Sequence, residues 1–139
     1  MYLLDTNVVT ELRRPDKAAS AVLAWSRAAV ADQLFISSIT VFEIELGVRQ
    51  KERRDATQGR LLRQWLEMQV LPQFQGRVLD VDMAVARRCA ALHSPHPAPE
   101  RDAWIAATAL VHHMTVVSRN TRDFLACGAQ VFNPWLAPD

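Results

Sequence analysis

Short apolar segments alternate with longer segments of helical periodicity along this chain. The apolar segments end at polar or turn-forming residues, which is typical of buried strands. Five of them are predicted as strands: Tyr2–Leu4, Leu34–Ser37, Val78–Val81, Met114–Ser118 and Gln130–Phe132. Because helical segments separate these strands, we expect parallel pairing with right-handed crossovers. The pattern therefore predicts an α/β fold of three layers, α/β/α, with a central, mainly parallel sheet of about five strands.

Between the predicted strands, apolar residues recur at the three- and four-residue spacing of amphipathic helices. The predicted helices are a short one from near Val8 to Pro15, then Asp16–Ala31, Thr40–Gln50, Ala56–Phe74, Met83–Leu92, Asp102–His113 and Thr121–Ala126. Pro134–Asp139 is predicted to be a short tail. There is no repeat or linker, and 139 residues can bury a core of their own. We expect residues 1–139 to form a single domain.

Four carboxylates occupy special positions in this pattern. Asp5 follows the first strand, Glu43 lies in the first turn of the helix after the second, and Asp123 follows the fourth. Asp102 opens an Ala-rich helix that no predicted strand directly precedes. Chain segments that follow parallel strands meet at one edge of the sheet, where such folds bind ligands. Asp5, Glu43 and Asp123 are therefore expected at that edge, and placing Asp102 there is an additional assumption.

Each acid also has a structural explanation. Asp5 could cap the helix that follows it, and Thr40 with Glu43 fits the capping-box pattern. Asp102 could favour the positive end of its helix dipole, and Asn120 could cap the helix that contains Asp123. Considered together, however, close carboxylates raise one another's pKa values. A hard cation such as Mg²⁺ or Mn²⁺ removes that conflict, because it prefers carboxylate and water oxygens.

The amino-acid composition says little about the partners of the protein or the compartment in which it acts. The net charge is +1, which neither demands nor excludes a nucleic-acid partner. Cys89 and Cys127 have no metal-binding spacing, so we expect free thiols in a reducing compartment and a cytoplasmic location. No signal segment opens the chain and no apolar run is long enough to span a membrane, so a membrane role is not expected.

Two longer motifs accompany the opening Asp5-Thr6-Asn7. One is Asp102-Ala-Trp-Ile-Ala-Ala-Thr-Ala, and the other is Ser118-Arg-Asn-Thr-Arg-Asp-Phe. Together with Glu43, and in this order, they resemble the PIN-domain family, and more narrowly the VapC/FitB-type toxins of toxin–antitoxin pairs. The resemblance covers essentially the whole chain. The proline-rich loop just before Asp102 is a departure from the family pattern that could shape a substrate groove.

The resemblance implies an Mg²⁺- or Mn²⁺-dependent ribonuclease. Its catalytic and metal-binding acids would be Asp5, Glu43, Asp102 and Asp123, and its supporting polar residues Thr6, Asn7, Ser118 and Asn120. It also implies a cognate VapB/FitA-type antitoxin that blocks the site and contacts operator DNA, and a homodimer of the toxin. In this hypothesis one ion is held by three of the acids, directly or through water, and the fourth acid completes the site or binds a second ion. The bound ion would activate a water against a phosphodiester of RNA.

RNA binding also needs cations, because phosphate contacts supply most of the nonspecific affinity. The candidates for RNA contact are Arg119, Arg122, Arg13 and Arg49. The basic run from Arg49 to Arg54 has an alternative explanation, in which it is the solvated end of a helix that complements the dipole.

Three other functions share some of these features. An aspartyl phosphatase would need an acid where the chain has Asn7, and both it and a receiver domain would need a late lysine, whereas the only lysines are Lys17 and Lys51. In the third, the chain is mainly a non-catalytic partner of an operator-binding antitoxin, and its acid cluster receives basic side chains.

Overall fold

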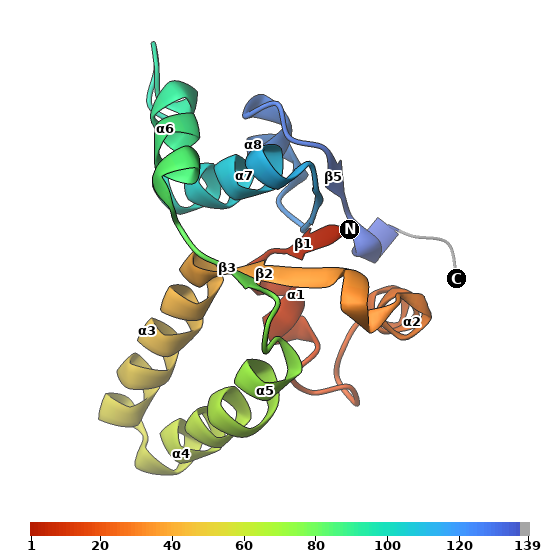
Figure 1. Ribbon diagram of the computed structural model, residues 1–139. Coiled ribbons are helices and arrows are strands. Elements are labelled where there is room, and N and C mark those ends of the chain that lie inside the picture. The colour runs from red at the N-terminus through yellow and green to blue at the C-terminus, as the bar shows by residue number, and fades with distance from the viewer. Residues whose placement is uncertain (137–139) are drawn as a thin grey trace.

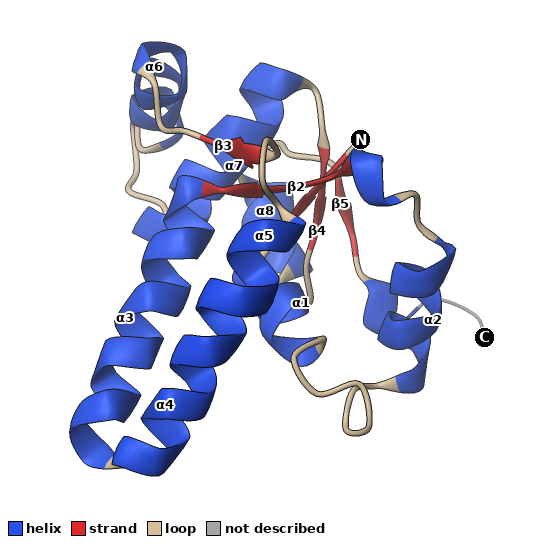
Figure 2. Ribbon diagram, turned by 60° about the horizontal axis from the view of Figure 1, so that its bottom comes forward, coloured by secondary structure: helices blue, strands red, loops and turns tan. Residues whose placement is uncertain are grey.

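A computed structural model describes residues 1–136 of the chain. Its centre is a five-stranded sheet in the order β3-β2-β1-β4-β5, and every neighbouring pair is parallel. The strands are β1 (Tyr2–Leu4), β2 (Leu34–Ser37), β3 (Val78–Leu79), β4 (Thr115–Val117) and β5 (Val131–Phe132). Helices cover both faces of the sheet (Figures 1 and 2). The predicted fold class is confirmed.

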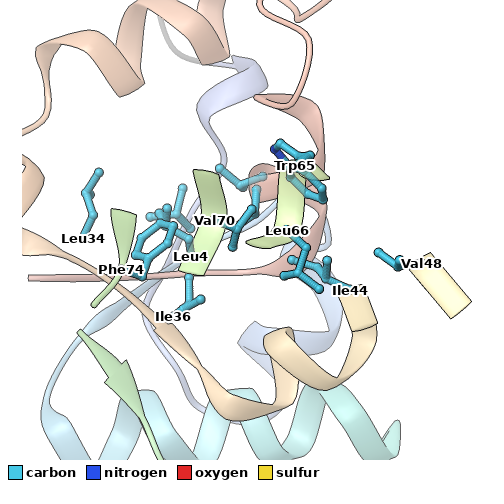
Figure 3. Close-up of a cluster of buried hydrophobic side chains, with 12 residues drawn as sticks. Leu4, Leu34, Ile36, Ile44, Val48, Trp65, Leu66, Val70 and Phe74 are labelled. Carbon is cyan, nitrogen blue, oxygen red and sulfur yellow. The ribbon is translucent and has the colours of Figure 1, made fainter. Parts of the chain in front are cut away.

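Strand β1 lies at the middle of the sheet and contributes to both hydrophobic clusters. Successive side chains of a strand point to opposite faces, so Leu4 packs into one cluster and Leu3 into the other. The Leu4 cluster lies under α1 (Thr6–Glu11), α3 (Ser38–Arg54) and α4 (Ala56–Trp65), and Figure 3 shows Ile44 and Trp65 within it. The Leu3 cluster packs against the helices of the other face.

The helices of the second face are α6 (Met83–Leu92), α7 (Glu100–His112) and α8 (Thr121–Ala126). Helix α7 is the most deeply buried of them, and its small residues Ala103, Ala106 and Ala107 are fully buried. Helix α2 (Ser20–Ala28) lies beside the C-terminal segment, which forms a turn of 3₁₀ helix over Pro134–Leu136. Within residues 1–136, no helix is sufficiently long and apolar to cross a membrane.

Several boundaries differ from the predicted ones. Strands β3, β4 and β5 are each shorter than expected, and Asp16–Ala31 is helical only over α2. Helix α3 begins two residues earlier than predicted and continues to Arg54, so Glu43 lies in its second turn, and α7 begins at Glu100 rather than at Asp102. The expected tail is a 3₁₀ turn up to Leu136, because Trp135 packs against the core. The rest of that segment lies outside the described residues.

The predicted single helix Ala56–Phe74 is divided into three parts. Helix α4 ends at Trp65, a turn of π helix follows over Leu66–Val70, and α5 is the short segment Leu71–Gln73. The apolar spacing continues through all three parts, which explains why the pattern indicated one helix. The π turn keeps both Leu66 and Val70 buried.

Helices α3 and α4 form a hairpin that extends away from the sheet (Figures 1 and 2). At Gly59 the two backbones approach so closely that a Cβ atom would lie 2.4 Å from the Cα atom of Glu52. Arg63 joins the two helices through ion pairs with Glu45 at 2.7 Å and Glu52 at 3.1 Å. These contacts hold the hairpin as one stiff unit.

Candidate active site

Asp5 is held at the carboxyl end of the central strand. Only 5 % of the residue is exposed. Its Oδ1 accepts a hydrogen bond from the backbone N–H of Thr6 at 2.8 Å, so it does cap α1. Its Oδ2 accepts from the Ser118 hydroxyl at 2.7 Å and from the Asn7 amide at 3.4 Å. Burial raises the pKa of Asp5, the hydrogen bonds from Ser118 and Thr6 lower it, and the charge of Glu43 raises it, with a net increase.

Glu43 reaches the same region from α3. Its Oε1 accepts a hydrogen bond from the Thr6 hydroxyl at 2.8 Å, and the oxygen of that hydroxyl is hydrogen-bonded to the Thr40 hydroxyl at 3.2 Å. The alternative explanation of Thr40 and Glu43 as a capping box is therefore wrong. Ser37 caps α3 instead, because its hydroxyl lies at the strand end and accepts from the Ile39 N–H at 3.0 Å.

Asp102 and Asp123 are joined by Asn120. The Asn120 side-chain amide donates to Asp102 Oδ2 at 2.7 Å and to Asp123 Oδ2 at 3.0 Å. Asn120 occupies the N-cap position of α8 but makes no capping hydrogen bond with its side chain. Its backbone N–H donates to the Ser118 hydroxyl at 2.9 Å, which links this pair of acids to Asp5.

Three of the four acids line one cavity of about 370 Å³: Asp5, Glu43 and Asp102. Thr6, Asn7 and Asn120 complete much of its wall. Asp123 is not among the residues that line this cavity, yet its charge still acts on Asp102. The pKa of Asp102 is raised to about 6, mainly by burial and then by the charges of the other three acids, while the hydrogen bond from Asn120 lowers it. The additional assumption about Asp102 is confirmed, because its carboxylate stands at the same edge as Asp5.

The donor set of this cavity suits a hard divalent cation. Carboxylate oxygens predominate, and their mutual repulsion is what such a cation relieves. Within residues 1–136, no group of three or more acid, histidine or cysteine side chains is arranged to hold a metal ion. Mg²⁺ does not require such a group, because it usually keeps several of its waters and takes only one or two carboxylates directly.

Four arginines are candidates for RNA contact, and they lie in different parts of the structure. Arg119 is exposed, and its backbone N–H donates to the Asn7 side chain at 3.4 Å while its guanidinium stacks on Trp135. Arg122 is in the first turn of α8, beside Asp123 in sequence. Arg13 lines a different hollow, between α4 and the end of α1. Arg49 pairs with Glu45 at 3.0 Å, on the hairpin.

Sequence reasoning missed Arg101. Its guanidinium lies 3.6 Å from Glu43 Oε2 and 5.2 Å from the ring centroid of the exposed Phe42. No pattern distinguished it from the other arginines, because the contact joins α7 to α3 across the cavity. Its position directly before Asp102 was the one available signal.

Comparison with known proteins identifies the family to which this chain belongs. A family model described as the PIN domain matches residues 2–128. The chain belongs to the PIN-domain family. Toxin FitB of Neisseria gonorrhoeae is 39% identical to this PIN domain over 141 residues, covering 97% of this chain and 99% of the relative. VapC ribonuclease Y4jK of Sinorhizobium fredii is 39% identical over 145 residues, covering 97% and 98%.

Solved structures agree with this assignment. The FitAcB crystal structure from Neisseria gonorrhoeae superposes on this PIN domain with a TM-score of 0.89 and 37% identity, covering 99% of this chain and 100% of that chain. The structure of FitAB bound to an IR36 DNA fragment gives the same TM-score of 0.89, covering 100% and 99%. VapBC2 from Rickettsia felis, bound to a promoter DNA fragment, shares the fold with a TM-score of 0.71 at 19% identity and covers 95% and 97%.

Proposed function

We propose that this chain is a metal-dependent ribonuclease and the toxin of a toxin–antitoxin pair. The observation that carries the proposal is the convergence of Asp5, Glu43 and Asp102 on one cavity from three different elements. Relatives that match over nearly their whole length are named toxin FitB and VapC ribonuclease, which supports the same reaction class. We further propose that residues 1–139 act as a single domain.

The acids of the cavity would hold Mg²⁺ or Mn²⁺. Asp5, Glu43 and Asp102 would bind it directly or through water, and Asp123 would complete the site. When bound, the ion lowers the pKa of a coordinated water and stabilises the charge that develops on the phosphodiester. These four acids are the proposed catalytic residues.

The supporting polar residues fix the directions of the acids. Ser118 and Asn7 hold one oxygen of Asp5, Thr6 holds Glu43, and Asn120 holds Asp102. Such outer hydrogen bonds orient metal ligands and tune their basicity. Arg119, Arg122, Arg13 and Arg49 are the proposed phosphate contacts, of which Arg119 is tied most directly to the site through Asn7.

Solved relatives are FitAB and VapBC complexes, several bound to DNA. We therefore propose a cognate VapB/FitA-type antitoxin that blocks the cavity, with operator DNA bound only through that antitoxin, and a homodimer acting in the cytoplasm. A second candidate function is a non-catalytic role in which the acids only receive basic side chains. The contact between Arg101 and Glu43 favours it, because it shows that this acid accepts a guanidinium within the chain.

Sequencing of RNA ends separates the two functions. Total RNA is incubated with the wild type, Asp5→Asn and Asp32→Asn, each with Mg²⁺, with Mn²⁺ and with EDTA. Asp32 is an exposed acid just before β2, at the end of that strand away from the cavity, and serves as the matched control. We expect new ends only with Mg²⁺ or Mn²⁺, and only from the wild type and the control. Equal cutting by folded Asp5→Asn, or no cutting by the wild type in Mg²⁺ or Mn²⁺, would refute the proposal.

A further inference from the structure

Positive charge is concentrated at the far end of the α3–α4 hairpin. We call residues 49–60 the hairpin end. It carries five cations against two acids, although the whole chain has only one more cation than it has acids. All five cations are exposed: Arg49, Lys51, Arg53, Arg54 and Arg60. The charge of the rest of the chain is therefore slightly negative, and the hairpin end is the basic part of the molecule.

The two acids of the hairpin end are already engaged. Glu52 pairs with Arg63 at 3.1 Å, and Asp55 caps α4 by accepting from the Gln58 N–H at 3.1 Å. Among residues 1–136, ion pairs to cations of the hairpin end occur only at Arg49, which binds Glu45. The other four cations are exposed and form no ion pair within the described residues.

Helix dipoles explain only part of this arrangement. Cations in the last turn of a helix are favourable, which accounts for Lys51, Arg53 and Arg54 at the end of α3. Arg60, however, lies in the second turn of α4, nearer the positive end of that helix, where the dipole gives a cation no stabilisation. The cations therefore cluster where α3 ends and α4 begins, at the negative end of one helix dipole and toward the positive end of the other.

The hairpin also sets the position of this charge relative to the acids. Glu43, Gly47, Gln50 and Arg54 follow one another at spacings of four, three and four residues, so they share one face of α3. Eleven residues of helix separate Glu43 from Arg54, which is about 16 Å. Gly47 is exposed, and nothing lies within 4 Å of where its Cβ would be, so the strip between them is unobstructed. The continuous helix α3 sets this distance, and the contacts of Gly59 and Arg63 hold α4 against it.

We propose that the hairpin end binds the phosphate backbone of the RNA, away from the bond that is cut. The inference rests on the proposed ribonuclease function. At roughly 3.4 Å per nucleotide of a stacked strand, 16 Å corresponds to about five nucleotides. The hairpin end therefore acts on long RNA more than on very short RNA, and its contribution to binding depends strongly on salt because each phosphate contact releases counterions.

The test compares two triple variants with the same change in net charge. One is Lys51→Gln, Arg53→Gln and Arg54→Gln at the hairpin end. The control is Arg27→Gln, Arg87→Gln and Arg88→Gln, three exposed arginines on α2 and α6. Both are made in the Asp5→Asn background, so that a labelled 20-nucleotide RNA stays intact, and circular dichroism checks that both fold. Affinity is measured over a series of salt concentrations.

We expect the hairpin-end variant to bind about tenfold more weakly at low salt than the control does. Its plot of log affinity against log salt should lose about 2 of its slope, from three single-strand contacts. With Asp5 restored, its loss of kcat/KM should be larger on the 20-nucleotide RNA than on a tetranucleotide.

Equal binding by the two triple variants, or an equal loss on both RNA lengths, overturns the inference. So does a loss of affinity for the co-expressed antitoxin with RNA binding unchanged, because the surface would then fit an acidic protein. These failures leave metal-dependent cutting by the wild type intact, which distinguishes them from failure of the proposed function.

Discussion

Replacing Asp102 by Asn should stabilise the metal-free protein near neutral pH. The pKa of Asp102 is raised from 3.8 to about 6 in the folded chain, first by burial and then by the neighbouring acids. Asn removes the charge but keeps an oxygen that can accept the 2.7 Å hydrogen bond from Asn120. The substitution therefore isolates the electrostatic cost of gathering these carboxylates.

The size of the effect follows from proton linkage. Between about pH 4 and pH 6 the folded chain still holds the Asp102 proton, whereas the unfolded chain has lost it. Stability of the wild type therefore falls as pH rises through this window, and the full cost is present above pH 6. The difference in pKa corresponds to about 3 kcal/mol, and solvent screening of this partly exposed group reduces it to about 1–2 kcal/mol.

Urea unfolding in EDTA at pH 4 and pH 7.5 measures this difference in the free energy of unfolding. We expect Asp102→Asn to exceed the wild type in free energy of unfolding by about 1–2 kcal/mol at pH 7.5, and to match it at pH 4. Asp32→Asn, outside the cavity, should match the wild type at both values. A gain of the same size at both pH values, or no gain at pH 7.5, would show that the acids do not repel one another as the geometry indicates.

Three further predictions concern the hairpin and the support of Asp5. Gly59→Ala should lower the free energy of unfolding by about 1–3 kcal/mol, because the new Cβ would meet the Glu52 backbone at 2.4 Å. Gly47→Ala should raise it by about 0.5–1 kcal/mol, since nothing stands within 4 Å; urea unfolding measures both, and changes of the same sign would contradict the packing. Ser118→Ala removes the 2.7 Å bond to Asp5 and should weaken Mn²⁺ binding about 10- to 100-fold by calorimetry, whereas unchanged affinity would exclude Ser118 as a support for the ion.

The sequence predicted which helices and strands form more accurately than it predicted where each of them begins and ends. Tyr2–Leu4 was correct because an apolar run stops at a polar residue, which is a local signal. Val78–Val81 was too long because pairing depends on the partner strand, and only Val78 and Leu79 find partners on β2. A strand's length is a property of two segments, and one segment alone cannot show it.

The site was predictable to the extent that it follows from topology. Asp5 and Glu43 come after neighbouring strands, so a parallel sheet brings them to one edge. Asp102 was placed there by family resemblance, because the contact between α7 and the sheet edge has no local signature. The contact of Arg101 with Glu43 was missed for the same reason. Asn120 had a local explanation as a cap, yet its amide holds Asp102 and Asp123 instead.

The two outermost strands have a consequence for self-association. Strands β3 and β5 each contain only two residues, so either edge of the sheet offers few free backbone groups to a strand of another molecule. Two copies of this chain cannot join their sheets into a continuous ladder over any useful length. We therefore expect the proposed homodimer to be built mainly from helix faces rather than from a sheet that continues through both copies.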